Sequence, residues 1–197
     1  MKQFPASHLV PCRARLWALV FENPQAKVPL DLWWSLSVEF AAIMLDGNSL
    51  DCNLTADWVR LPGVRDWRAL DGVHVSGGMD IVNASFYTEE HGPVVRSAVW
   101  IDRRHGATFR LRWSAVVDLS GWGDPHLEPT TTVNIDVPAD FDGVFIYQGL
   151  LETESDTERA ANRLASQFID LKTLGPFEKW VNEFDVMQYR FPPMGGA

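Results

Sequence analysis

Residues 94–119 read VVRSAVWIDRRHGATFRLRWSAVVDL, and this stretch decides the fold class. Residues 94–101 form one predicted strand, residues 102–106 a turn and residues 107–119 the returning strand. In the return, apolar side chains alternate with polar ones, a period of two that predicts one buried and one solvated face. Gly106 closes the turn, where glycine adopts a positive φ without steric cost. The stretch therefore predicts an antiparallel β-hairpin in a sheet with one wet face.

Further alternating segments lie on both sides of this hairpin. The Asp46-Gly47 pair is a strong hairpin signal, and Gly77-Gly78 indicates a bulge or bend inside a strand. We expect a second hairpin in which residues 138–143 form the turn, with Asp140 and Asp142 as turn residues. The predicted strands of these segments cover residues 13–21, 33–45, 50–55, 73–87, 130–137 and 144–148.

The period changes after residue 150. A capping box at residues 155–158 precedes apolar residues at helical spacing, which predicts a helix of about four turns. Pro176 is suited to the first turn of a second helix, with an apolar stripe that includes Phe177 and Val181. Residues 186–191 read as a last short strand, and residues 192–197 as a loose tail.

Strands first and helices last predict an α+β fold. We expect mostly antiparallel β structure, a curved sheet or a sandwich of about eight strands, with two C-terminal helices packed on it. The expected organisation is a single domain, residues 1–197, made of a β-rich part (1–150), a helical C-terminal part (151–191) and the tail (192–197). Nine tryptophans and 46% hydrophobic residues suit a real core and exclude a disordered chain.

Compartment and cysteine usage are read from the same composition. The N-terminus lacks the pattern of a signal peptide, and no stretch has the roughly twenty apolar residues of a membrane span. We therefore expect a cytoplasmic protein. In that compartment Cys12 and Cys52 are expected to be two isolated buried thiols, although one disulfide between them is possible.

The charge is unevenly distributed along the chain. The net charge is −9, yet residues 93–120 carry five basic and two acidic residues, whereas residues 121–197 carry five basic and thirteen acidic ones. An acidic protein repels nucleic-acid phosphates and attracts basic partners. The arginines of the hairpin are not interleaved with exposed aromatic side chains, because Phe109 and Trp113 fall on its buried face. The charge pattern thus predicts a basic protein partner and no nucleic acid.

Familiar catalytic and cofactor motifs are missing from the sequence. There is no phosphate loop, no dinucleotide fingerprint, no zinc-protease motif and no nucleophile elbow. The acidic turn around Gly143 lacks the first and twelfth ligands of a calcium loop. A catalytic triad assembled from distant residues stays open, because triads are spatial. We expect no cofactor, and the absence of motifs favours a protein that is not an enzyme.

The best polar constellation lies in the loop of residues 121–128. Asp124, His126 and Glu128 are spaced by two, so in an extended segment they share one face. Such a face suits a metal, an acid/base pair or a partner surface, but the same composition is ordinary for a loop. We expect no metal here. The candidate partner-binding residues are Trp122, Asp124, His126, Glu128, Asp140 and Asp142.

The tryptophans divide into two predicted groups. Trp17, Trp34, Trp100 and Trp113 fit positions in strands and are expected in the core. Another three, Trp58, Trp67 and Trp122, lie in predicted loops and are better candidates for a recognition surface.

Two functions remain open from the sequence. The first is a non-enzymatic, acidic protein-binding domain, with an inhibitor or immunity-type role as one example, because an acidic face speeds capture of a basic partner. The alternative is a small-molecule-binding or hydrolase-like domain with its site between the sheet and the C-terminal helices. A large polar cavity would favour the alternative, and a filled core with an exposed acidic or aromatic patch would favour protein binding.

Overall fold

A computed structural model describes residues 1–45, 47–88, 90–152, 154–181 and 187–195. Strands account for 58% of the chain. The strands are β1 (Pro11–Asn23), β2 (Val28–Leu45), β3 (Asn48–Val59), β4 (Val73–Gly77), β5 (Asn83–Tyr87), β6 (His91–His105), β7 (Thr108–Asp118), β8 (Thr130–Ile146), β9 (Glu178–Val181) and β10 (Met187–Phe191). The helices are α1 (Thr157–Ala165) and the 3-10 turns η1 (Ala6–His8), η2 (Trp67–Leu70), η3 (Ser120–Trp122), η4 (Gln148–Leu150) and η5 (Leu171–Thr173).

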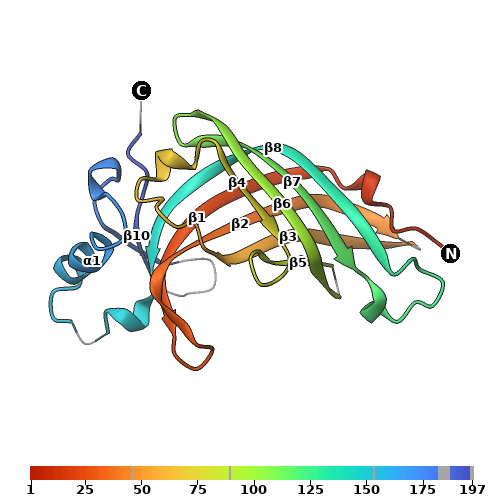
Figure 1. Ribbon diagram of the computed structural model, residues 1–197, viewed down its shortest axis with the longest axis horizontal. Coiled ribbons are helices and arrows are strands. Elements are labelled where there is room, and N and C mark those ends of the chain that lie inside the picture. Colours follow the sequence, from red (N-terminus) through yellow and green to blue (C-terminus); the bar gives the residue numbers. More distant parts are fainter. Residues whose placement is uncertain (46, 89, 153, 182–186, 196–197) are drawn as a thin grey trace.

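Seven of these strands close into a barrel (Figure 1), in the order β1-β2-β3-β5-β6-β7-β8. Neighbouring strands are antiparallel except at the closure, where β8 pairs with β1 in parallel. Strand β4 pairs with the second half of β6, beyond the shorter β5, and β10 and β9 extend the sheet from β8. The expectation of an open curved sheet or sandwich is therefore wrong. Sequence periodicity predicts the faces of strands but carries no signal for a pairing between the first and the eighth strand.

The expectation of two C-terminal helices packed on the sheet is also wrong. Among the described residues the C-terminal part has one α-helix, α1. Its N-cap is Asp156, whose side chain accepts the amide N–H of Arg159, one residue later than the cap at Ser155 that the capping box predicted. The second expected helix is instead β9, which pairs with β10. An apolar stripe this short is compatible with both helical and strand spacing. Pairing with β10 favours the strand. Residues 182–186, which include the rest of that stripe, lie outside the described residues.

Residues 130–148 do not form the expected hairpin. They form one long strand, β8, so Asp140 and Asp142 are strand residues and not turn residues. The first part of β8 pairs with β7 and its last part pairs with β1 and β10. At the change of partner, Gly143 has a φ of 121°, and a Cβ there would collide with the carbonyl oxygen of Phe191. Gly143 is therefore required because β10 approaches β8 closely at this position. From the sequence alone, a glycine here indicated a turn.

The hairpin that decided the fold class is confirmed as β6 and β7. Val99 lies opposite Trp113, and the Trp113 indole is 1% exposed with its N–H donated to the Ser97 hydroxyl at 2.7 Å. The turn itself is tighter than expected, because His105 already pairs with Thr108.

Side chains fill the barrel interior. Alternate residues of every wall strand point inward, and the space left among apolar side chains such as Leu16, Trp34 and Val99 is about 20 Å³. A void of that size has room for about one water molecule, and a small-molecule site needs roughly 300–1,000 Å³. The barrel is therefore a packed scaffold, and ligands or partners must meet it on its surface.

Aromatic side chains cover both ends of the barrel. At one end Phe4 packs edge-on against Phe86 and Trp122, with ring centroids 5.6 and 5.7 Å apart. At the other end Trp67 stacks on Phe141 at 5.1 Å and donates its indole N–H to the Thr173 carbonyl at 2.9 Å. This second end carries η2, the β6–β7 turn and the C-terminal segment.

The tryptophans and cysteines depart in part from their predicted places. Trp34 and Trp113 are core residues, whereas Trp17 and Trp100 are half-buried on the outer face of the barrel. Both cysteines are free thiols, but only Cys52 is buried, and burial raises its pKa to about 11. Among the described residues, no helix has the length and apolar character needed to span a lipid bilayer.

Candidate functional site

One irregularity of the barrel wall places two side chains where the regular ladder has room for one. Leu36 lies opposite Ala56 and Trp34 opposite Val59, so Ser35 faces both Asp57 and Trp58. This is a β-bulge, two residues on one strand against one on its neighbour. Because Ala56 and Val59 both point into the core, the β3 bulge (Asp57 and Trp58) points both of its side chains outward.

The backbone of Trp58 is strained. Its φ is 58°, in the left-handed region that bulky residues rarely adopt. Such a conformation costs about 1–3 kcal/mol, and residues that carry this cost cluster at functional sites. Trp58 is nonetheless 37% exposed, so burial of its indole is a weak reason for the strain.

Trp58 belongs to a small group of rings on the outer face, the aromatic cluster (Phe21, Trp58 and Tyr147). Phe21 stacks on Trp58 at 5.8 Å with an interplanar angle of 15°, and Tyr147 meets Phe21 edge-on at 5.2 Å. The rings come from the ends of β1, β3 and the residue after β8. Tyr147 is 49% exposed. Exposed tryptophan and tyrosine side chains held by a rigid sheet are the residue types that dominate protein interfaces.

Asp57, which directly precedes Trp58 in the bulge, is half-buried. Burial raises its pKa above 3.8, and a hydrogen bond from the Ser35 hydroxyl offsets part of that effect. Among the described residues no basic side chain contributes to its pKa. A partly desolvated carboxylate without a cation nearby is the kind of group that gains most from a cationic ligand.

The β3 bulge offers a half-buried carboxylate and an exposed indole. Ser35 is only 3% exposed, so its hydroxyl cannot reach a substrate, and it lies next to a carboxylate without a described histidine partner. An ammonium or guanidinium group could instead pair with Asp57 and lie over an aromatic face, which contributes about 0.5–2 kcal/mol.

The six residues predicted from the sequence do not form one surface. Trp122 is half-buried in η3 and packs against Phe4 and Phe86. The Asp124 carboxylate accepts the amide N–H of His126 at 2.8 Å, and Glu128 accepts from the Gln3 side chain at 3.3 Å. These contacts hold the loop to the N-terminal segment at one end of the barrel.

Asp140 and Asp142 lie far from that loop along β8. Ten residues of strand separate Asp140 from Thr130 where β8 begins, roughly 33 Å at 3.3 Å per residue. Asp140 accepts a hydrogen bond from the Thr108 hydroxyl at 2.7 Å, and Asp142 lies 3.9 Å from Arg15. Burial raises the pKa of Asp142, and Arg15 opposes this shift.

Many acidic groups of residues 121–158 have local partners. Besides those above, Asp136 forms a two-point ion pair with Arg110, and Glu154 pairs with Arg163 at 2.7 Å. A carboxylate paired within its own fold steers a partner less than a free one. The role of these residues in partner binding stays a prediction, and its electrostatic argument is weaker than the sequence indicated. Within the described chain, no three histidine, cysteine or acidic residues group as a metal site.

Sequence reasoning found Trp58 but missed the bulge around it. Trp58 was expected in a loop, and it is instead a strand residue. Asp57 was not a candidate, because a bulge is set by pairing between β2 and β3. The available signal was the order apolar, acidic, aromatic, apolar over residues 56–59, which breaks strict alternation by one residue.

Comparisons with known proteins give no relative to reason from. No protein-family model matches the chain, no curated protein matches it, and no solved structure matches it. The function must therefore be argued from the residues of this chain alone.

Proposed function

We propose that the protein is a non-enzymatic binding domain that recognises a basic segment of another protein at the β3 bulge. One observation carries the proposal: Asp57, half-buried and with no basic side chain of the described residues contributing to its pKa, directly precedes the strained, exposed Trp58. A lysine or arginine side chain fits this pair, with its charge on Asp57 and its apolar stem along the rings.

Two further features support a basic protein partner. The filled barrel interior leaves no room for a small ligand inside, so recognition takes place on the outside. The net charge of −9 steers a basic partner toward the whole molecule. No feature of the described residues distinguishes an inhibitor or immunity-type role from other uses of a binding surface.

The test uses a capped glycine–arginine–glycine peptide and the same peptide with citrulline, which has the shape of arginine without its charge. Binding is followed through the indole N–H signals in two-dimensional NMR. We expect the arginine peptide to shift the Trp58 signal. The citrulline peptide should have an affinity at least about tenfold lower, because a charge-assisted hydrogen bond is lost.

Matched variants locate the site. Asp57→Asn should abolish the shift, and Trp58→Ala, which removes the reporting indole itself, should abolish peptide binding measured by calorimetry. Asp51→Asn is the control, because it removes one exposed negative charge near the start of the same strand, six residues before Asp57. Equal binding by Asp57→Asn and wild type would contradict the proposal. For a protein that copurifies with this chain, the same two variants should lose it and the control should retain it.

A further inference from the structure

A second bulge of the barrel lies at the end that Trp67 covers. In the β6–β7 hairpin, Asp102 pairs with Arg110 and His105 with Thr108, so two residues face Phe109. These two residues, Arg103 and Arg104, form the β6 bulge. Arg103 has a φ of 53°, the same left-handed strain that Trp58 shows.

The β6 bulge borders a cleft of about 390 Å³, the basic cleft, bounded by η2, the β6–β7 turn and the C-terminal residues 172–173 and 194–195. Its lining includes the basic side chains of Arg68, Arg104 and Lys172, and no aspartate or glutamate. Concave sites of this size hold small organic ligands. Just outside this lining, Asp66 pairs with Arg68 and Asp170 adds a further negative charge near it, so Arg104 is the arginine of the cleft with no carboxylate partner among the contacts of the described residues.

The two arginines are held in place by contacts that leave donors free. Arg68 forms a two-point ion pair with Asp66 through Nε and Nη2, at 2.9–3.1 Å. Arg104 donates one Nη1 hydrogen bond to the Gly106 carbonyl at 3.0 Å, and its guanidinium lies 5.7 Å from the centre of the Trp67 ring. A guanidinium has five N–H donors, so each arginine keeps donors for a ligand.

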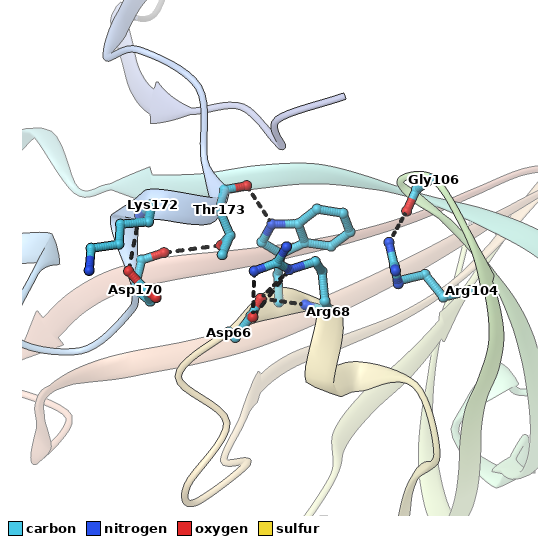
Figure 2. A network of polar contacts seen from close by, with 8 residues as sticks. Asp66, Arg68, Arg104, Gly106, Asp170, Lys172 and Thr173 are labelled. Carbon is cyan, nitrogen blue, oxygen red and sulfur yellow. Dashed lines mark hydrogen bonds and ion pairs between the residues drawn. The ribbon is translucent and has the colours of Figure 1, made fainter. Parts of the chain in front are cut away.

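Figure 2 shows how the cleft is arranged around these residues. Arg68 comes from η2 and Arg104 from the end of β6, and the stretch with Lys172 and Thr173 lies across from them. The Lys172 side chain extends away from the two arginines, so Arg68 and Arg104 are the residues proposed to hold a ligand. Asp66 acts as the residue that positions Arg68, and that pairing lowers the pKa of Asp66 and keeps it ionised.

We propose that the basic cleft binds a small multivalent oxyanion, of the phosphate-ester or pyrophosphate class, between Arg68 and Arg104. Guanidinium groups match the paired oxygens of phosphate, and two of them favour an anion with more than one charge. The cleft lies between the barrel and the C-terminal segment, so a bound ligand contacts both. This site is separate from the β3 bulge and does not depend on its function.

The experiment titrates the whole chain with pyrophosphate, inorganic phosphate and acetate at fixed ionic strength. Calorimetry gives the affinity, and the Trp67 indole N–H, which borders the cleft, reports the place by NMR. We expect pyrophosphate to bind more tightly than phosphate, and acetate to give no saturable binding. Similar weak responses to all three anions would overturn the proposal, as would a saturable response that leaves the Trp67 signal unmoved.

Substitutions separate the cleft from the general charge of the surface. Arg104→Gln and Arg68→Gln should each weaken pyrophosphate binding about tenfold or more, since each removes charge-assisted hydrogen bonds. Arg163→Gln is the control, an exposed arginine that is paired with Glu154 elsewhere. Unfolding temperature and circular dichroism show whether each variant is folded. Equal weakening by all three variants would overturn the proposal, because it would indicate unspecific attraction.

Discussion

The β3 bulge and the β6 bulge solve the same geometric problem with opposite chemistry. Each places two residues against one, and each contains a non-glycine residue at positive φ, 58° for Trp58 and 53° for Arg103. The β3 bulge interrupts outward positions and presents a carboxylate with an indole to solvent. The β6 bulge faces the inward Phe109, at the end of the barrel, and places the Arg104 guanidinium over the Trp67 ring that covers it. The two bulges thus differ in what they build: both residues of the β3 bulge belong to the outer surface, whereas Arg104 of the β6 bulge lines a cleft at the end of the barrel.

The largest expected effect separates the two tryptophans next to these bulges. Trp67 is 1% exposed, so Trp67→Ala should cost about 3–5 kcal/mol in the free energy of unfolding, as should Trp113→Ala. Trp58 is 37% exposed, and Trp58→Ala should cost less than half as much. Chemical denaturation measures all three. Equal losses at positions 58 and 67 would mean that Trp58 is a structural residue, and the comparison would fail.

Glycine substitutions should give opposite signs at the two strained positions. Replacing a left-handed residue by glycine releases about 1–2 kcal/mol of strain and costs about 0.5–1 kcal/mol of chain entropy. Arg103→Gly should therefore stabilise the fold by about 0.5 kcal/mol. Trp58→Gly also loses the stack on Phe21 and should be destabilising by at least about 1 kcal/mol. Denaturation midpoints of the two variants provide the check, and a stabilised Trp58→Gly would show that the aromatic cluster contributes little.

A smaller effect follows from the carboxyl group of the β3 bulge. Burial raises the pKa of Asp57, so the folded protein binds this proton more tightly than the unfolded chain. The contribution of Asp57 to stability therefore falls as pH rises from the ordinary carboxyl range through the raised pKa. Asp57→Asn carries no such penalty and should be more stable than wild type at pH 7. Thermal unfolding over a pH series should show this gain disappearing below about pH 4, and a loss of stability at pH 7 would contradict the burial argument.

The smallest expected effect is no change at all. Arg104→Gln should bind the arginine peptide as wild type does, and Asp57→Asn should bind pyrophosphate as wild type does. Each variant alters one bulge, and the two bulges lie on different strands with different lining residues. The NMR and calorimetric titrations measure both cross-combinations. A substantial loss in either one would show that the two surfaces act as one site.

Local pattern predicted more of this molecule than its closure or its candidate sites. The alternation in residues 107–119 correctly placed Trp113 in the core, and the change of spacing after residue 150 correctly indicated a helix there, although its cap is Asp156 and not the Ser155 of the predicted capping box. The barrel was missed because it depends on β1 pairing with β8, which no local period records. The β3 bulge was missed for a related reason: Asp57 becomes notable only once Ser35 is known to face it.

Charge was the least reliable guide to a site. The sequence places thirteen acidic residues after position 120, but structure shows Asp136, Asp142 and Glu154 opposite arginines of the same chain. The basic residues of the hairpin likewise form one positively charged stretch in the sequence. In the structure Arg110 and Arg112 pair with aspartates, and Arg104 borders the cleft. Counting charges along a chain cannot tell a paired group from a free one, because pairing is a property of the sheet.

The parallel pairing of β1 with β8 also sets the order in which the chain can fold. Arg15 meets Asp140 across this seam, so the contact joins residues from opposite ends of the barrel sequence. Contacts of such separation form late, because a long loop must close before they contribute. During synthesis β1 and β2 can pair early, while the free edge of β1 waits for β8 to emerge. An unpaired strand edge is open to other chains, so crowding of nascent or refolding chains should favour aggregation through β1, and the completed seam removes that edge.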